Sequence, residues 1–185
     1  MKNFLISIKI TIAFAVILFL GYVLVLWGIS NVVAPNGGKA ETLTFDGKVV
    51  GASNVAQNFT SIRYFWPRPS AVNYDGSGSG GSNKSNADKE YLAEVENRID
   101  AFLVSHPYLN RSEVPSEMVT ASSSGLDPHI SPNGAMVQAQ RVAMARGVDV
   151  EQVLKLVEEC QEKTLIGVTV VNVLKLNIAL DEKYK

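Results

Sequence analysis

The stretch from Asp75 to Ser85 is rich in glycine and serine, and residues of these types can cradle phosphate. Gly76, Gly78 and Gly81 fit the G-x-G-x-x-G spacing that brings a backbone close to a dinucleotide. That motif follows a strand and opens a helix, whereas the segment before this stretch is aromatic and rich in proline. A P-loop also fails, because Asn83 stands where its second glycine belongs. We therefore interpret the stretch as a flexible linker.

A second stretch, Thr120 to Pro132, contains the residue types of a serine hydrolase: Ser122–Ser124, Asp127 and His129. Such a site needs a histidine that contacts the serine and is oriented by an acid. A proline separates the acid from the histidine, so their side chains need not meet, and no G-x-S-x-G pattern occurs in the chain. We expect a rigid loop that offers a docking surface. A membrane-anchored extracytoplasmic hydrolase or binding protein is the alternative function.

Metal chemistry needs several histidine, cysteine or acid ligands held together. The chain has two histidines, His106 and His129, far apart in sequence, and one cysteine, Cys160. We predict no metal site. A single cysteine also permits no disulfide within the chain, so packing alone must stabilise the core.

The densest aromatic run lies at residues 64–71, with the sequence YFWPRPSA. Its two prolines exclude a helix or a central strand. If exposed, the run would form a contact surface, because Trp, Tyr and Arg concentrate at binding hot spots. If buried, it would be an irregular corner of the core. Arg68 is hard to bury without a partner, which favours contact. The candidate partner-contact residues are Tyr64, Phe65, Trp66, Arg68, Asp127 and His129.

These loops belong to a chain with one long apolar segment, Ile10 to Ile29, which carries no charge. As a helix it is about 30 Å long, the thickness of the bilayer core. Its Leu, Ile, Val and Phe residues together favour membrane insertion by about 4 to 8 kcal/mol. A cleaved signal peptide would have a shorter apolar region and a small-x-small cleavage site. We therefore predict a single retained transmembrane helix.

The positive charges predict the orientation. Lys2 and Lys9 precede the span and the next cation is Lys39, so the positive-inside rule places residues 1–9 in the cytoplasm. Residues 30–40 then connect the span to one extracytoplasmic domain, residues 41–185. After the span the chain has 15 basic and 18 acidic residues, and it lacks the basic surface that nucleic acid requires.

The outer domain is expected to be a mixed α/β (α+β) fold. Asp46-Gly47 between two β-prone runs predicts a hairpin. Helices are predicted over 86–104, capped by Ser85 or Asn86, over 132–146 after Ser131, and again after Asp149.

The sequence makes two further predictions, one about the first helix and one about residues 165–180. The first helix should bury a face that includes Leu92 and Phe102, and His106 should follow its end as a residue favoured by the helix dipole. Residues 165–171 could form a strand and 171–180 a helix. We favour the helix, because polar residues interrupt any strict alternation.

Five segments together resemble one family, the C chain of the bacterial Kdp potassium-transporting P-type ATPase (KdpC). They are residues 64–71 (YFWPRPSA), 79–83 (SGGSN), 119–132 (VTASSSGLDPHISP), 141–147 (RVAMARG) and 171–181 (VNVLKLNIALD). With the single N-terminal span, the resemblance covers nearly the whole chain in order.

The resemblance implies a non-catalytic accessory subunit of a complex that hydrolyses ATP to import potassium across the bacterial inner membrane. Its partners would be a channel-like pore subunit, a P-type ATPase subunit and a small single-span subunit. The complex would handle ATP and potassium, and we predict no cofactor on this chain.

The family is also described as a catalytic chaperone that raises the affinity of the ATPase subunit for ATP. In that role the loop Ser79, Gly80, Gly81, Ser82 and Asn83 is similar to the signature loop of ABC transporters. The nucleotide is cytoplasmic, so an outer domain could affect it only through the membrane subunits.

Overall fold

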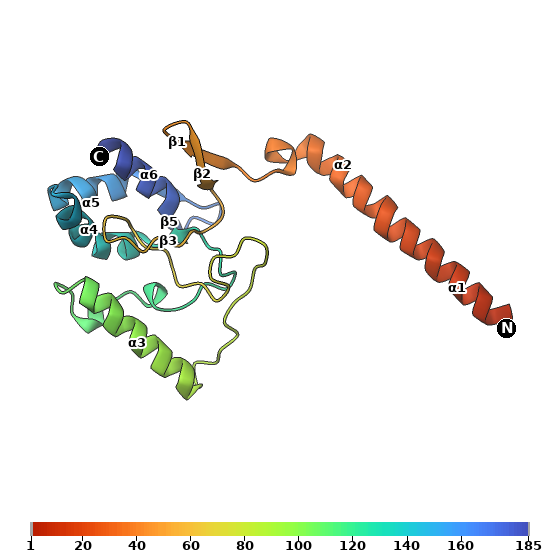
Figure 1. The fold of residues 1–185 in the computed structure, drawn as a ribbon, viewed down its shortest axis with the longest axis horizontal. Coiled ribbons are helices and arrows are strands. Elements are labelled where there is room, and N and C mark those ends of the chain that lie inside the picture. Colours follow the sequence, from red (N-terminus) through yellow and green to blue (C-terminus); the bar gives the residue numbers. More distant parts are fainter. Residues whose placement is uncertain (1, 185) are drawn as a thin grey trace. The chain divides into compact units, whose positions relative to one another are not determined.

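The structure is a computed structural model and describes residues 2–184. Its N-terminal unit contains one continuous helix, drawn in red and orange in Figure 1, that is long and apolar enough to cross a membrane. Its segments are α1 (Lys2–Ala15), the π-helical η1 (Val16–Tyr22) and α2 (Val23–Val33). None of these segments has a buried side chain, as suits a helix surrounded by lipid. The prediction of one long N-terminal apolar helix is confirmed.

The helix continues through Val33, beyond the predicted span. It ends at Ala34, whose backbone is extended (φ −78°, ψ 147°), the conformation favoured before a proline. A 3₁₀ turn, η2 (Pro35–Gly38), follows. The helix therefore includes residues 30–33 of the expected connection. The chain divides into two compact units after Glu41.

The second unit begins with the predicted hairpin. β1 (Thr42–Phe45) and β2 (Lys48–Ala52) pair antiparallel. Asp46 and Gly47 between them have φ values of 48° and 73°, as a tight turn of this kind requires.

Four α-helices follow within the described residues: α3 (Lys89–Ser105), α4 (Pro132–Arg146), α5 (Val150–Glu159) and α6 (Val173–Lys183). The sequence predicts α4 correctly at both ends. The Ser131 hydroxyl accepts the N–H of Gly134, and Gly147 ends the helix with a φ of 69°. α3 begins later than predicted, because the carboxylate of Asp88 caps it in place of Ser85 or Asn86.

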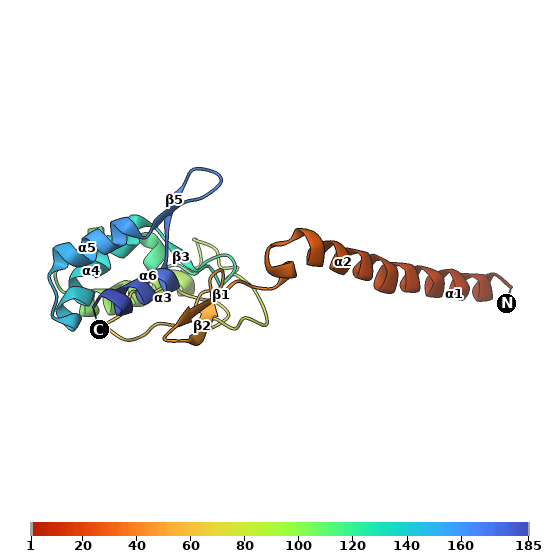
Figure 2. The same cartoon turned by 90° about the horizontal axis from the view of Figure 1, so that it is seen from above.

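A three-stranded antiparallel sheet has the order β3 (His129–Ile130), β5 (Thr169–Asn172), β4 (Gln161–Lys163). β3 lies in a loop that we expected to be wholly irregular, because its pairing with the distant β5 leaves no local signal. The sequence leaves a strand over 165–171 open and favours a helix over 171–180. The structure has both, because β5 starts at Thr169 and α6 follows it from Val173. Leu165 and Ile166 lie in the exposed loop that projects between β4 and β5 in Figure 2.

α4, α5 and α6 lie on one side of the domain's core, and α3 lies on the other (Figure 1). α4 packs against α5 and α5 against α6, while α3 lies apart from them with long loops between (Figure 1). α3 contributes Phe102 to the core, but Leu92, predicted to be buried, is exposed. The largest fully buried apolar side chains are Phe65, Ile130, Val142, Val153, Val157, Val171, Leu176 and Leu180. The mixed α+β class is confirmed.

Candidate interaction site

The aromatic run crosses the domain without regular structure, and buried amide side chains replace a neighbouring strand. Asn177 of α6 accepts the N–H of Phe65 at 2.8 Å and donates to its carbonyl at 3.0 Å. Gln138 of α4 makes the same two bonds to Trp66, at 2.8 and 3.2 Å. The run is thus a satisfied, irregular part of the core. Phe65 is fully buried, so its side chain does not reach the surface of this domain.

A buried arginine also stabilises the aromatic run. Arg141 of α4 donates to the carbonyls of Ile62 (2.6 Å) and Tyr64 (3.0 Å) and to the side-chain oxygen of Gln138 (2.9 Å). Its guanidinium also lies 4.0 Å from the centroid of the Trp66 ring, which is a cation–π contact. Its charge is therefore held by carbonyl dipoles and an aromatic face.

His106 follows α3 as predicted, but its role is different. Its Nε2 lies 2.9 Å from Arg141 Nε and its Nδ1 lies 2.7 Å from the carbonyl of Phe102. Arginine can only donate, so Nε2 accepts and the proton is on Nδ1. Burial, aided by the Arg141 charge and opposed by the Phe102 carbonyl, lowers the pKa of His106 to about 4. The histidine is neutral, so the predicted interaction of its charge with the helix dipole is wrong.

Three of the candidate contact residues meet in one half-exposed group, the Arg68 cluster (Arg68, Asp127, His129). Arg68 Nη1 lies 3.5 Å from Asp127 Oδ2, and the backbone N–H of His129 donates to Asp127 Oδ1 at 3.0 Å. The three side chains are 24%, 33% and 36% exposed. Burial raises the pKa of Asp127, but hydrogen bonds from His129 and the Arg68 charge outweigh it, so this pKa lies below its ordinary value. The cluster therefore presents both signs of charge at the surface of the domain.

The other two half-buried candidates make their hydrogen bonds elsewhere. The Tyr64 hydroxyl donates to Asp181 of α6 at 2.8 Å, and Arg146 binds the other oxygen of that carboxylate at 2.7 Å. The indole N–H of Trp66 donates to the carbonyl of Ser61 at 2.9 Å. These contacts hold Tyr64 and Trp66 in place. Of the candidate contact residues, those of the Arg68 cluster therefore offer the exposed charged groups.

The Asp127–His129 pair resembles the acid and base of a hydrolase, since His129 Nδ1 lies 3.5 Å from Asp127 Oδ1. The serines do not complete it. Ser122 is buried, and the Ser124 hydroxyl accepts the N–H of Leu126 at 3.1 Å. Across residues 2–184 no serine hydroxyl hydrogen bonds to His129, and no three His, Cys, Asp or Glu side chains come together as metal ligands.

The glycine-rich stretch packs against the serine loop. The N–H of Gly80 donates to the carbonyl of Ser124 at 2.8 Å. A Cβ on Gly81 would lie 3.0 Å from the carbonyl oxygen of Ser123, and one on Gly125, whose φ is +68°, would lie 2.8 Å from that of Gly80. These glycines are explained by close approach of two backbones. The stretch is a loop held within one domain and not the linker that its composition suggested.

The helix that follows this loop offers no free phosphate site at its N-terminus. The Asp88 carboxylate accepts the N–H groups of Glu90 and Tyr91, the groups that a phosphate would bind in a P-loop. The negative charge of Asp88 also opposes an anion there. The geometry agrees with the interpretation that the sequence is not a P-loop.

Sequence reasoning missed the polar residues that hold the aromatic run, namely Gln138, Arg141 and Asn177. A signal was present: Gln138 and Arg141 are three residues apart on the face of α4 that also carries Ala139 and Val142. A polar pair on an otherwise apolar helix face has to find partners in the core.

The fold and the site together define a class of protein, a membrane-anchored α+β domain whose loops are locked to one another by hydrogen bonds. The chain matches KdpC, the c chain of the K⁺-transporting ATPase, over residues 4–182. It is 57% identical over 187 residues to a potassium-transporting ATPase KdpC subunit of Bacteroides fragilis (strain YCH46), with 98% of each chain covered.

More distant relatives agree. A KdpC subunit of Bacteroides thetaiotaomicron is 56% identical, with 98% of this chain and 99% of the relative covered. One from Caldanaerobacter subterraneus subsp. tengcongensis is 44% identical, with 97% and 94% covered. The chain belongs to the KdpC family, as its motifs predicted.

Proposed function

We propose that this chain is the accessory C subunit of a Kdp-type complex that imports potassium at the expense of ATP, and that it acts by holding the pore and P-type ATPase subunits together. The observation that carries the proposal is the full-length similarity to KdpC subunits, 57% identity over 98% of both chains. The apolar helix would pack against partner helices in the membrane, and the domain would bind the pore subunit.

We place the domain outside the cytoplasm. Lys2 and Lys9 are the only charges before residue 39, and cytoplasmic ends of membrane helices attract such residues. Cysteine labelling from either side of sealed cells tests this orientation. A membrane-impermeant thiol reagent should label Lys155→Cys, an exposed position of α5, in intact cells.

The proposed contact with the pore subunit is the Arg68 cluster. Half-exposed charged groups that are already oriented bind without a large ordering cost. The test is co-purification of the complex in mild detergent with His129→Ala or Arg68→Ala, and Lys155→Ala of α5 as the matched exposed control. A hot-spot residue contributes about 2 kcal/mol, which corresponds to about a thirtyfold weaker association. Full recovery with both variants, both folded, would exclude this contact.

The Ser79–Asn83 loop is proposed to position the serine loop and not to touch ATP. Any effect of this chain on ATP affinity would then pass through the membrane subunits. Ser79 is exposed, so Ser79→Ala should leave the KM for ATP of the purified complex unchanged. A several-fold rise in KM would support nucleotide contact instead.

A further inference from the structure

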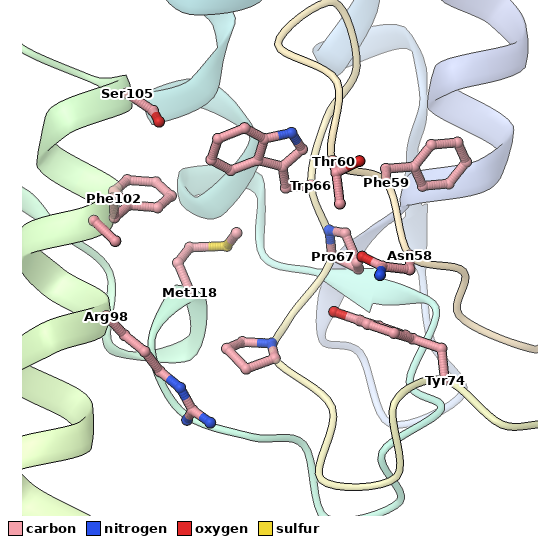
Figure 3. Close-up of a pocket in the computed structure, with 12 residues that line it drawn as sticks. Asn58, Phe59, Thr60, Trp66, Pro67, Tyr74, Arg98, Phe102, Ser105 and Met118 are labelled. Carbon is pink, nitrogen blue, oxygen red and sulfur yellow. The ribbon is translucent and has the colours of Figure 1, made fainter.

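A cleft of about 590 Å³ lies between α3 and the aromatic run. Figure 3 shows Arg98, Phe102 and Ser105 on the α3 side, facing Trp66 and Tyr74 across the cleft. Most of its surface is apolar, and its size is typical of ligand-binding pockets. Neither the Arg68 cluster nor the glycine loop lines it.

A second hollow of about 450 Å³ lies beside the first, and Ser105 lines both. Its rim carries Ile62, Val104 and Met144, which are 56%, 82% and 73% exposed. Single exposed apolar residues are ordinary, but several beside an apolar cleft mark an interaction surface. We call the two hollows together the α3 cleft. A compact ligand would fill one of them, whereas an elongated one would occupy both.

The charges at the α3 cleft have one sign. Arg98 lines the first hollow and Arg141 the second, and no acidic residue lines either. Among the described residues Arg141 makes no ion pair. Within residues 2–184 the one ion pair of Arg98 is with Glu94, an exposed residue one turn earlier on α3, and Arg98 also donates to the carbonyl of Val119 at 3.2 Å. Since Arg141 already covers a face of Trp66, the cleft favours a ligand with a carboxylate over a cationic one.

Polar side chains at the edges are free to bind a peptide backbone. In the described part of the chain, the side chains of Asn58, Thr60 and Ser105 make no hydrogen bond, although all three line the first hollow. An aromatic-lined groove with such groups at its rim suits an extended peptide, whose N–H and C=O groups need partners.

We propose that the α3 cleft binds an extended apolar segment with an acidic residue, supplied by another subunit of the complex. The inference rests on the proposed function, because that function provides the partner. The apolar side chains occupy the two hollows, the backbone bonds to the edge groups, and the carboxylate lies beside Arg98, whose side chain is partly exposed.

The first test is photo-cross-linking in the purified complex. In two variants the cross-linking residue p-benzoylphenylalanine replaces Thr60 or Val104, which line different hollows. In a control variant it replaces Glu151, an exposed residue of α5. The expected result is that positions 60 and 104 cross-link to one apolar, acid-containing stretch of a single partner subunit. Cross-linking to lipid, to a stretch without an acid, or no more than at the control position overturns the inference.

The second test compares Val104→Glu with Val104→Lys. Both remove the same apolar side chain at a site 82% exposed, so neither should disturb folding. An acidic occupant predicts about fivefold lower retention of the Glu variant in the complex, and a difference that shrinks in about 0.5 M salt. Equal retention, or weaker retention of the Lys variant, overturns the inference. If the native chain recovers no partner at all, the proposed function itself fails.

Discussion

The buried pair of His106 and Arg141 makes the stability of the domain depend on pH in a defined window. The pKa of His106 is about 4 in the folded chain, against an ordinary value of 6.5. Between these values the unfolded chain binds more protons, so the free energy of unfolding rises with pH. The stabilisation is complete above the ordinary value and is lost as the pH falls towards 4.

The size of the effect follows from the shift. The full difference between the two pKa values of His106 corresponds to about 3 kcal/mol of unfolding free energy. About 2 kcal/mol of this stabilisation is lost between pH 7 and pH 5. The structural reason is local. A proton on Nε2 of His106 removes the acceptor for Arg141 Nε and places two cations 2.9 Å apart.

Urea unfolding of the chain in detergent measures this loss, with Trp66 as the reporter in a Trp27→Phe background. His106→Gln keeps an acceptor that does not titrate, so its unfolding free energy should vary less between the two pH values by about 2 kcal/mol. His129→Gln is the matched control, because His129 is the other histidine and is partly exposed. An unchanged pH dependence in His106→Gln, or its loss in His129→Gln, would refute the reasoning.

Three further experiments test the packing of the loops. Asn177→Ala leaves the N–H and carbonyl of Phe65 unpaired in the core, so it should lower the unfolding free energy measured in urea by about 2 to 4 kcal/mol. Lys155→Ala, at an exposed position, is the control and should lower it by less than about 0.5 kcal/mol. Gly125→Ala should lower the Tm by several degrees, because its φ is +68° and its Cβ would lie 2.8 Å from the Gly80 oxygen, while Gly76→Ala has open space and should not. A double-mutant cycle on Arg68 and Asp127 should give a coupling below about 1 kcal/mol, because both are partly exposed; a much larger value would contradict the half-exposed geometry.

Local signals in the sequence predict the elements that depend on their own residues. Ser131-Pro132 and Gly147 set both ends of α4, and Asp46-Gly47 sets the first hairpin, because caps and tight turns are chosen within a few residues. The apolar helix is equally local, since length and composition decide it.

Features that depend on distant partners could not be predicted in this way. β3 is two residues long and exists because β5, some forty residues later, pairs with it. The aromatic run left two alternatives open, and the partners that hold it, Gln138 and Asn177, lie on other helices. Gly80 and Gly81 suggested flexibility by composition, whereas the structure uses them for close packing against another loop.

The positions of the candidate contact residues also depend on distant partners. Phe65 and Trp66 looked alike in the sequence, but backbone bonds to buried amides turn the first side chain into the core and lay the second over Arg141. Arg68, Asp127 and His129 come together because hydrogen bonds join their two loops, from the Ser122 N–H to the Pro69 carbonyl and from the Ser70 hydroxyl to the Gly125 carbonyl.

The central claim is that this chain works as a subunit, and purification of the native complex tests it most directly. The chain would carry a C-terminal tag, be solubilised in mild detergent and be analysed by mass with whatever accompanies it. A large multi-span protein and a P-type ATPase should be recovered in fixed ratio with the chain. Recovery of the chain alone, folded and without these partners, would contradict it.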